Sequence, residues 1–234
     1  MYVTTNEKRL YCAVFAGLFA AISFTLAQDI SIEESYLRKS VETMIIREQA
    51  LSGDRDTKFA ALKHIRQLMD NGDTSEDLRE ILSHMALEGI LNKTRLDGRI
   101  INNFPDVRMK AVEYLGDIKD KESTDALIRV LLIDDEPYVV TTAVKALTKQ
   151  GFGDGDYSMN IILHVFTQYD SRMPSNVLAL SVIDSCNSFM EGGKTENTLI
   201  YATLLNISNN PSYVKPVRDY AGETLEKIYS KKGN

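Results

Sequence analysis

Apolar residues recur at helical spacing along most of the chain, and one such pattern occurs five times. In the clearest copy, Val107, Ala111, Leu115 and Ile118 fall on one face of a helix, which is the face that must be buried. The same run of Val, Arg, Ala, Glu, Leu and Ile returns 110 residues later, from Val217. Five unrelated amphipathic helices would share the apolar spacing but not the recurring Val-Arg and Ala-Val pairs, so we interpret the copies as an internal repeat. Each copy has a small residue at its centre, which would let a neighbouring helix approach closely: Ala61, Ala111, Ala143, Ser181 and Ala221.

These central residues are on average 40 residues apart, which is the length of a unit made of two packed helices. We call the helix that carries the motif the first helix. All five prolines lie near the start of a first helix, where a missing backbone N–H costs least. A further helix over Ile32–Ala50 would cap the stack, and the pattern as a whole predicts an all-α fold, an α-α superhelix of about five helix pairs. Second helices are predicted over Ser75–Leu87, Ser123–Leu132, Tyr157–Gln168 and Thr195–Ile207.

The sharpest motif lies in Pro105–Leu147. It reads Pro-Asp-Val-Arg-x-x-Ala-Val-x-x-Leu-Gly-x-Ile-x-Asp, followed by Asp-Ala-Leu-Ile-Arg-Val-Leu and then Asp-Asp-Glu-Pro-Tyr-Val. This stretch resembles the bacterial HEAT repeat of the phycobilisome-lyase-like type. The resemblance covers most of residues 54–230 and is weaker in the copies where Val140 and Leu178 replace the family's Arg. It implies a HEAT/armadillo-like solenoid, whose usual work is to bind other macromolecules.

The first 27 residues have the layout of a secretory signal peptide. Lys8 and Arg9 precede an uncharged apolar run from Leu10 to Ala27, which ends in a small-residue cleavage pattern. An uncleaved membrane anchor is the alternative, because 18 apolar residues are at the lower end of what spans a bilayer. In either case we expect the body to be exported, to the periplasm, and to touch the membrane only if this segment is retained.

We therefore divide the chain into four parts. Residues 1–27 are the signal peptide or anchor, 28–53 the N-terminal capping helix, 54–230 the HEAT-like repeat domain, and 231–234 a tail. Cleavage after residue 27 would remove one acidic and two basic side chains, which changes the net charge from −6 to −7. Cys186 would then be the sole thiol, and we expect it to be buried within an apolar helix.

Composition and motifs argue against several classes of function. Lys and Arg number 27 against 33 Asp and Glu, so the chain has no basic field for nucleic acid. The three histidines stand apart without zinc-ligand spacing, and the sequence holds neither a nucleophile elbow nor a phosphate-binding glycine loop. Ser212 and Lys215 fit Ser-x-x-Lys, but we interpret Ser212 as a helix N-cap. We assign no catalytic residue, metal ligand or cofactor.

Two sets of residues are candidates for binding a protein partner. Repeat insertions map to loops on one face, often the binding face, and the segment Gly89–Asn103 is such an insertion. It holds Lys93, Arg95 and Arg99 against Asp97, so we predict a loop that contacts an acidic partner. An ordinary solvated loop is the alternative. The second helices are expected to line the concave surface, and the candidates on them are Arg79, Asp125, Arg129 and Gln168.

These observations favour an exported, non-enzymatic HEAT-repeat scaffold that mediates protein–protein interaction in the cell envelope and binds no nucleic acid. The resemblance leaves an alternative open, an enzyme or enzyme subunit of the bilin-lyase or hydroxylase HEAT type. The His-Glu pairs of those metal-dependent hydroxylases do not occur in this sequence. A lyase would be expected to meet its chromophore in the cytoplasm, which disagrees with an export signal.

Overall fold

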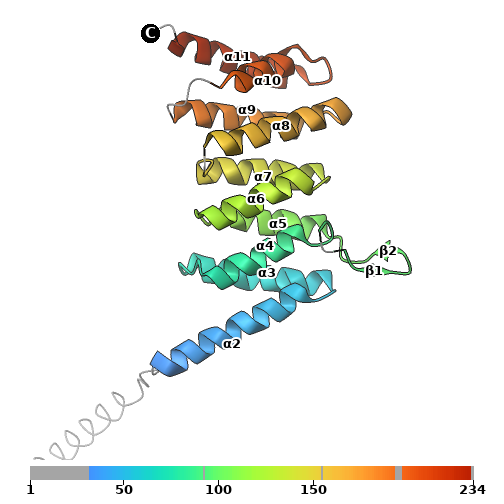
Figure 1. The fold of residues 1–234 in the computed structure, drawn as a ribbon, viewed down its shortest axis with the longest axis vertical. Helices are drawn as coiled ribbons and strands as arrows, with labels where there is room; N and C mark the ends of the chain where they lie inside the picture. The colour runs from blue at the N-terminus through green and yellow to red at the C-terminus, as the bar shows by residue number, and fades with distance from the viewer. Residues whose placement is uncertain (1–31, 92, 154, 193–196, 233–234) are drawn as a thin grey trace, which may run out of the picture. The chain divides into compact units, whose positions relative to one another are not determined.

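The computed structural model describes residues 32–91, 93–153, 155–192 and 197–232, and this part of the chain is predominantly helical (Figure 1). The all-α prediction is confirmed. One antiparallel hairpin, β1 (Arg95–Leu96) with β2 (Arg99–Ile100), lies between α4 and α5. The predicted signal peptide or anchor, residues 1–27, lies outside the described residues. The helices are α2 (Ile32–Leu51), α3 (Arg55–Asp70), α4 (Glu76–Leu87), α5 (Pro105–Leu115), α6 (Lys121–Ile133), α7 (Pro137–Gln150), α8 (Asp156–Arg172), α9 (Asn176–Glu191), α10 (Thr198–Asn209) and α11 (Lys215–Lys232).

Contacts divide the chain after Glu42, within α2, and residues from Thr43 onward form one compact unit. In that unit α3, α5, α7, α9 and α11 carry the repeated motif, and we call them the first-helix layer. The helices α4, α6, α8 and α10 form the second-helix layer, and each lies within four residues of its predicted bounds. Pro105 and Pro137 occupy the first positions of α5 and α7, as expected for proline. The end of α11 at Lys232 shows that the predicted tail, 231–234, begins within a helix.

The helices pair in a different frame from the predicted one. Each second helix packs most closely on the first helix that follows it, so α4 pairs with α5, α6 with α7, α8 with α9 and α10 with α11. The sequence pattern predicts instead that each first helix pairs with the second helix after it. The two frames bury the same apolar stripes, and periodicity alone identifies the buried face of a helix without identifying the neighbour that covers it.

Small residues bring neighbouring first helices close together. The central small residues of all five copies are buried. At Gly116, at the end of α5, an added Cβ would lie 2.8 Å from the Cβ of Ala146 on α7, so this approach leaves no room for a side chain. From α5 onward, neighbouring first helices lie closer together than neighbouring second helices do. That the second helices line a concave surface stays a prediction.

Two buried ion pairs stand at the same position of the repeat. Arg108, from the Val-Arg pair of the motif, is 1% exposed, and its Nε donates to Oδ2 of Asp134 at 2.8 Å. In the preceding copy Lys58 takes this place, and its Nζ donates to Oε2 of Glu88 at 2.6 Å. Asp134 directly follows α6 and Glu88 directly follows α4. Each ion pair therefore ties a first helix to the next helix pair in the stack.

The start of α11 corrects the interpretation of Ser212. The helix begins at Lys215, so Ser212 lies in the turn before it and does not cap it. The backbone N–H of Val214, directly before the helix, instead donates to Oδ1 of Asn176 at 3.0 Å, which fixes the turn against α9. Lys215 Nζ donates to Oδ2 of Asp219 at 2.6 Å, on its own helix.

Cys186 is fully buried on α9, which confirms the prediction for this thiol. Burial raises its pKa, so the reactive thiolate is scarce at neutral pH. We expect iodoacetamide to leave Cys186 unmodified in the native protein and to alkylate it fully in guanidinium chloride, as followed by peptide mass spectrometry. Equal alkylation with and without denaturant would contradict the burial of this residue.

Among the helices of the described ranges, none combines the length and the apolar character that a membrane crossing requires.

Candidate interaction surfaces

The hairpin replaces a short connection of the repeat. The chain between α4 and α5 spans residues 88–104, whereas the equivalent chain between α6 and α7 is limited to residues 134–136. Asp97 and Gly98 have positive φ angles of 48° and 78°, and Leu96 pairs with Arg99 across them. This is the geometry of a two-residue turn in a tight hairpin. The predicted insertion is present, but it folds into a hairpin that the sequence analysis does not predict. The Asp-Gly pair is the signal that sequence reasoning overlooked.

The base of the hairpin is fixed to the buried ion pair of α3. Asn102 is buried, its Oδ1 accepts from the backbone N–H of Thr94 at 2.9 Å, and its Nδ2 donates to Oε1 of Glu88 at 3.4 Å. Glu88 in turn accepts from Lys58. Gly89 has a φ of 78°, and an added Cβ there would lie 2.5 Å from the Asn102 carbonyl oxygen. The hairpin thus leaves the stack from a base that is held by several specific contacts.

The hairpin carries the three predicted basic residues. Lys93, Arg95 and Arg99 are all exposed. Nη1 of Arg95 donates to the carbonyl oxygen of Gly98 at 2.9 Å, across the turn. Leu96, next to these cations, is 61% exposed. The predicted contact of this segment with an acidic partner stays a prediction.

The candidates on the second helices have different environments. Arg129 and Gln168 are exposed on α6 and α8, and Asp125 is half-buried on α6. The side chain of Arg79 is 17% exposed, and its Nη1 lies 2.6 Å from Oδ2 of Asp120 at the start of α6. The structure therefore corrects the assignment of Arg79 as an exposed position, since this guanidinium ties α4 to α6.

Because the second helices are spaced more widely than the first, grooves open between them. The first groove, between the ends of α6 and α8, has a volume of about 310 Å³. Leu132, Ile133 and Met173 line it and are each about half exposed. Gln168, predicted as a candidate, also lines it. The lining also includes Asp134, Asp135 and Arg172, so the hollow combines apolar, amide and charged groups.

The side chain of Tyr169 holds the wall of this first groove in place. Its hydroxyl donates to the carbonyl oxygen of Asp134 at 3.0 Å and so joins α8 to the residue after α6. Burial, together with the nearby carboxylates of Asp134, Asp135 and Glu136, raises the pKa of Tyr169 to about 12. The hydroxyl therefore keeps its proton, and the hydrogen bond, throughout the neutral pH range.

The second groove lies on the other side of α8, between α8 and α10, and has a volume of about 430 Å³. Its wall includes His164 on α8 and Leu199 on α10, and Leu199 is 50% exposed. Two side-chain hydrogen bonds span α8 and α10. Nδ2 of Asn197 donates to Oδ1 of Asn160 at 2.8 Å, and Nδ2 of Asn206 donates to Oδ2 of Asp170 at 2.7 Å. The spacing of the two helices along this groove is thus fixed by specific contacts.

Sequence reasoning missed the apolar residues of both grooves. The run Leu131-Leu132-Ile133 was a usable signal, because three consecutive apolar residues cannot all lie on one face of a helix. Only Leu131 is fully buried. Leu132 and Ile133 line the first groove.

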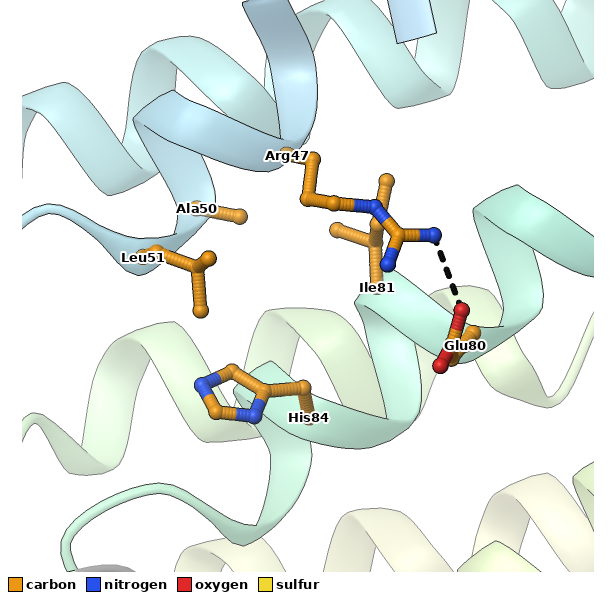
Figure 2. A pocket seen from close by; sticks show the side chains of 6 residues that line it. All are labelled: Arg47, Ala50, Leu51, Glu80, Ile81 and His84. Carbon is orange, nitrogen blue, oxygen red and sulfur yellow. Dashed lines mark hydrogen bonds and ion pairs between the residues drawn. The ribbon is translucent and has the colours of Figure 1, made fainter. Parts of the chain in front are cut away.

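A third hollow, near the C-terminal end of α2, is too small for a ligand site. It holds about 100 Å³, against the roughly 300–1,000 Å³ of typical ligand pockets. In Figure 2 the Arg47 side chain reaches across to Glu80, and the two form an ion pair of 2.8 Å. The cation of this hollow is therefore already paired. Its lining consists of Arg47, Ala50, Leu51, Glu80, Ile81 and His84.

Within the described residues, no group of three or more His, Cys, Asp and Glu side chains is placed to hold a metal ion. The histidines lie on three separate helices, α3, α4 and α8. His164 forms a hydrogen bond of 2.9 Å with Gln168, one turn away on the same helix. His164 also adds a polar group to the wall of the second groove.

Comparison with known families locates the repeat in the middle of the chain. Residues 99–157 match the family model for HEAT repeats. The matched segment contains β2 and the helices α5, α6 and α7, and it reaches the start of α8. A comparison with curated proteins finds no match. The match and the consecutive helix pairs together support a HEAT-repeat protein, whose fold is an all-α helical-repeat solenoid.

Proposed function

We propose that this protein is an exported, non-enzymatic scaffold that binds a protein partner through the second-helix face of its repeat stack. HEAT repeats commonly act as protein-interaction scaffolds. Export is inferred from the layout of residues 1–27 and is tested by sequencing the N-terminus of the native protein in the cell-envelope fraction. A start near residue 28 supports cleavage, and a retained N-terminus supports an anchor.

The observation that carries the proposal is the pair of adjacent grooves on either side of α8. Exposed apolar side chains stand on both, with polar groups between them, which is the composition of a protein-binding surface. Met173 lines the first groove and Leu199 lines the second, and each side chain is half exposed. A partner that spans α8 could bury both side chains at once. A repeat stack leaves such ridges free, since its own core is closed between neighbouring helices.

We expect Met173→Glu and Leu199→Glu each to weaken partner binding by more than about tenfold, because each places a charge in a desolvated contact. Exposed substitutions of this kind change stability by less than about 0.5 kcal/mol, so folding is expected to persist. The measurement is affinity purification from the envelope of the native host, followed by titration of the recovered partner. The matched control is Leu205→Glu, at a residue of α10 that is 52% exposed and lies outside both groove linings. Leu205→Glu is expected to bind the partner as tightly as the wild type does. If Met173→Glu and Leu199→Glu also bind it as tightly as the wild type, the grooves are not the binding site.

The alternative of a bilin-lyase or hydroxylase-type enzyme makes a different prediction. It requires a bound metal, or a shift in tetrapyrrole absorbance when the protein is added. Elemental analysis of the purified protein and a tetrapyrrole titration test it directly. No specific contact among the described residues favours this alternative.

A further inference from the structure

We propose that the basic hairpin, residues 93–101, is a second contact site and that it binds an anionic lipid surface. It replaces a short connection of the repeat and is held at its base by the Lys58–Glu88–Asn102 contacts described above. The inference is independent of the grooves, and each site can fail its own test without affecting the other.

Charge favours an anionic surface. The hairpin carries Lys93, Arg95 and Arg99 against Asp97, a net of +2, in a chain whose total is −6. The rest of the chain therefore carries −8 and would be repelled by anionic lipid. An arm from Thr94 to the turn extends roughly 10 Å at the usual rise of a strand, which is comparable to the Debye length of about 8 Å at physiological salt. Figure 1 shows the hairpin extending away from the helices, so the tip is largely screened from the negative body.

Exposed apolar residues accompany the cations. The strand register pairs Leu96 with Arg99, and the backbone N–H of Ile101 donates to the Thr94 carbonyl oxygen at 3.0 Å. Leu96, Arg99 and Ile101 therefore share one face of the ribbon. Leu96 is 61% and Ile101 44% exposed. Apolar side chains that enter the acyl boundary while cations stay at headgroup level are the signature of an interfacial segment.

The placement of the cations favours lipid over an acidic protein. The register puts Arg95 on the opposite face of the ribbon from Arg99. A single acidic helix or strand would meet one face and leave the other cation in water. A fluid layer of anionic headgroups can surround the tip and contact both faces together.

A single tryptophan at the hairpin tip tests this inference, because the natural chain contains none. In full-length protein carrying Leu96→Trp, we expect the emission to move to shorter wavelength with vesicles of phosphatidylglycerol and phosphatidylcholine, and to stay unchanged with phosphatidylcholine alone. Leu205→Trp, exposed on α10, is expected to show no change with either. Because the readout is local to the tip, an apolar N-terminal segment that enters the bilayer cannot imitate it.

In the Leu96→Trp background, changing Lys93, Arg95 and Arg99 to Gln is expected to reduce partitioning to the anionic vesicles about a hundredfold, at about fivefold per cation. The matched control changes three exposed lysines elsewhere, Lys63, Lys145 and Lys227, to Gln and should leave partitioning unchanged or slightly stronger. The inference is overturned if the tip emission does not shift, or shifts equally with neutral vesicles. A shift with polyglutamate but not with vesicles would also overturn it and would assign the hairpin to an acidic protein.

Discussion

Asp134→Ala is expected to lower the free energy of unfolding by about 3–5 kcal/mol, because it leaves the guanidinium of Arg108 buried without its acid. Arg108 and Asp134 are both almost fully buried, and two Arg108 nitrogens donate to this carboxylate. Urea unfolding followed by circular dichroism measures the change. A loss smaller than about 1 kcal/mol would mean that water reaches the pair, and would contradict the burial that the repeat imposes.

A double variant separates the cost of an unpaired charge from the cost of a disrupted repeat. In two other copies the position of Arg108 is taken by Val140 and Leu178, which are buried and apolar. We therefore expect Arg108→Leu with Asp134→Asn to recover most of the stability lost in Asp134→Ala, since it leaves no unpaired charge in the core. Asn keeps an acceptor for the backbone N–H of Glu136, which Asp134 binds at 2.9 Å. If the double variant is as unstable as Asp134→Ala, the ion pair itself is required for the repeat.

Glu88→Ala is the second change with a large expected effect, again about 3–5 kcal/mol of unfolding free energy. The ammonium of Lys58 would stay fully buried without its acid, with the Ala50 carbonyl oxygen still accepting from it. The same change removes the hydrogen bond from the Asn102 amide to Glu88 at the hairpin base. We therefore expect trypsin to cut after Lys93, Arg95 and Arg99 faster than in the wild type, under conditions in which the helices stay folded.

The control for this variant is Lys58→Met with Glu88→Leu. It replaces the buried pair by apolar groups and is expected to recover most of the stability, while the hairpin stays as sensitive to trypsin as in Glu88→Ala. If Glu88→Ala lowers stability but leaves the cleavage rate in the hairpin unchanged, then the Glu88–Asn102 contact does not anchor the hairpin.

The repeat and the helices could be predicted from the sequence because their signals are local. The spacing of Val107, Ala111 and Leu115 identifies a buried face, and the prolines mark the helix starts. The pairing frame could not be predicted, since the stripe on α5 is satisfied equally by α4 or α6 as a neighbour. Contacts across the stack decide this choice, and they depend on how closely residues such as Gly116 let two backbones approach.

The candidate site could be predicted in part. The inserted basic segment with Lys93, Arg95 and Arg99 is predictable from its composition. The hairpin within it depends on Asp97-Gly98 as a two-residue turn, which the sequence analysis does not consider. Gln168 was found, whereas Met173 and Leu199 were not. Their exposure follows from the wide spacing of the second helices. The periodicity within a single helix does not reveal how far away the neighbouring helix lies.

The central claim, that the second-helix grooves bind a protein, is tested most directly by photo-crosslinking in intact cells. A photoreactive amino acid is placed in turn at Leu132 and Met173 in the first groove, at Leu199 in the second, and at Lys145, an exposed residue of the first-helix layer, as the control. We predict one and the same protein adduct from the three groove positions and none from Lys145. We also predict that the Leu132 adduct disappears when Leu199→Glu is added in the other groove. No adduct from the groove positions, or the same adduct from Lys145, would contradict the claim.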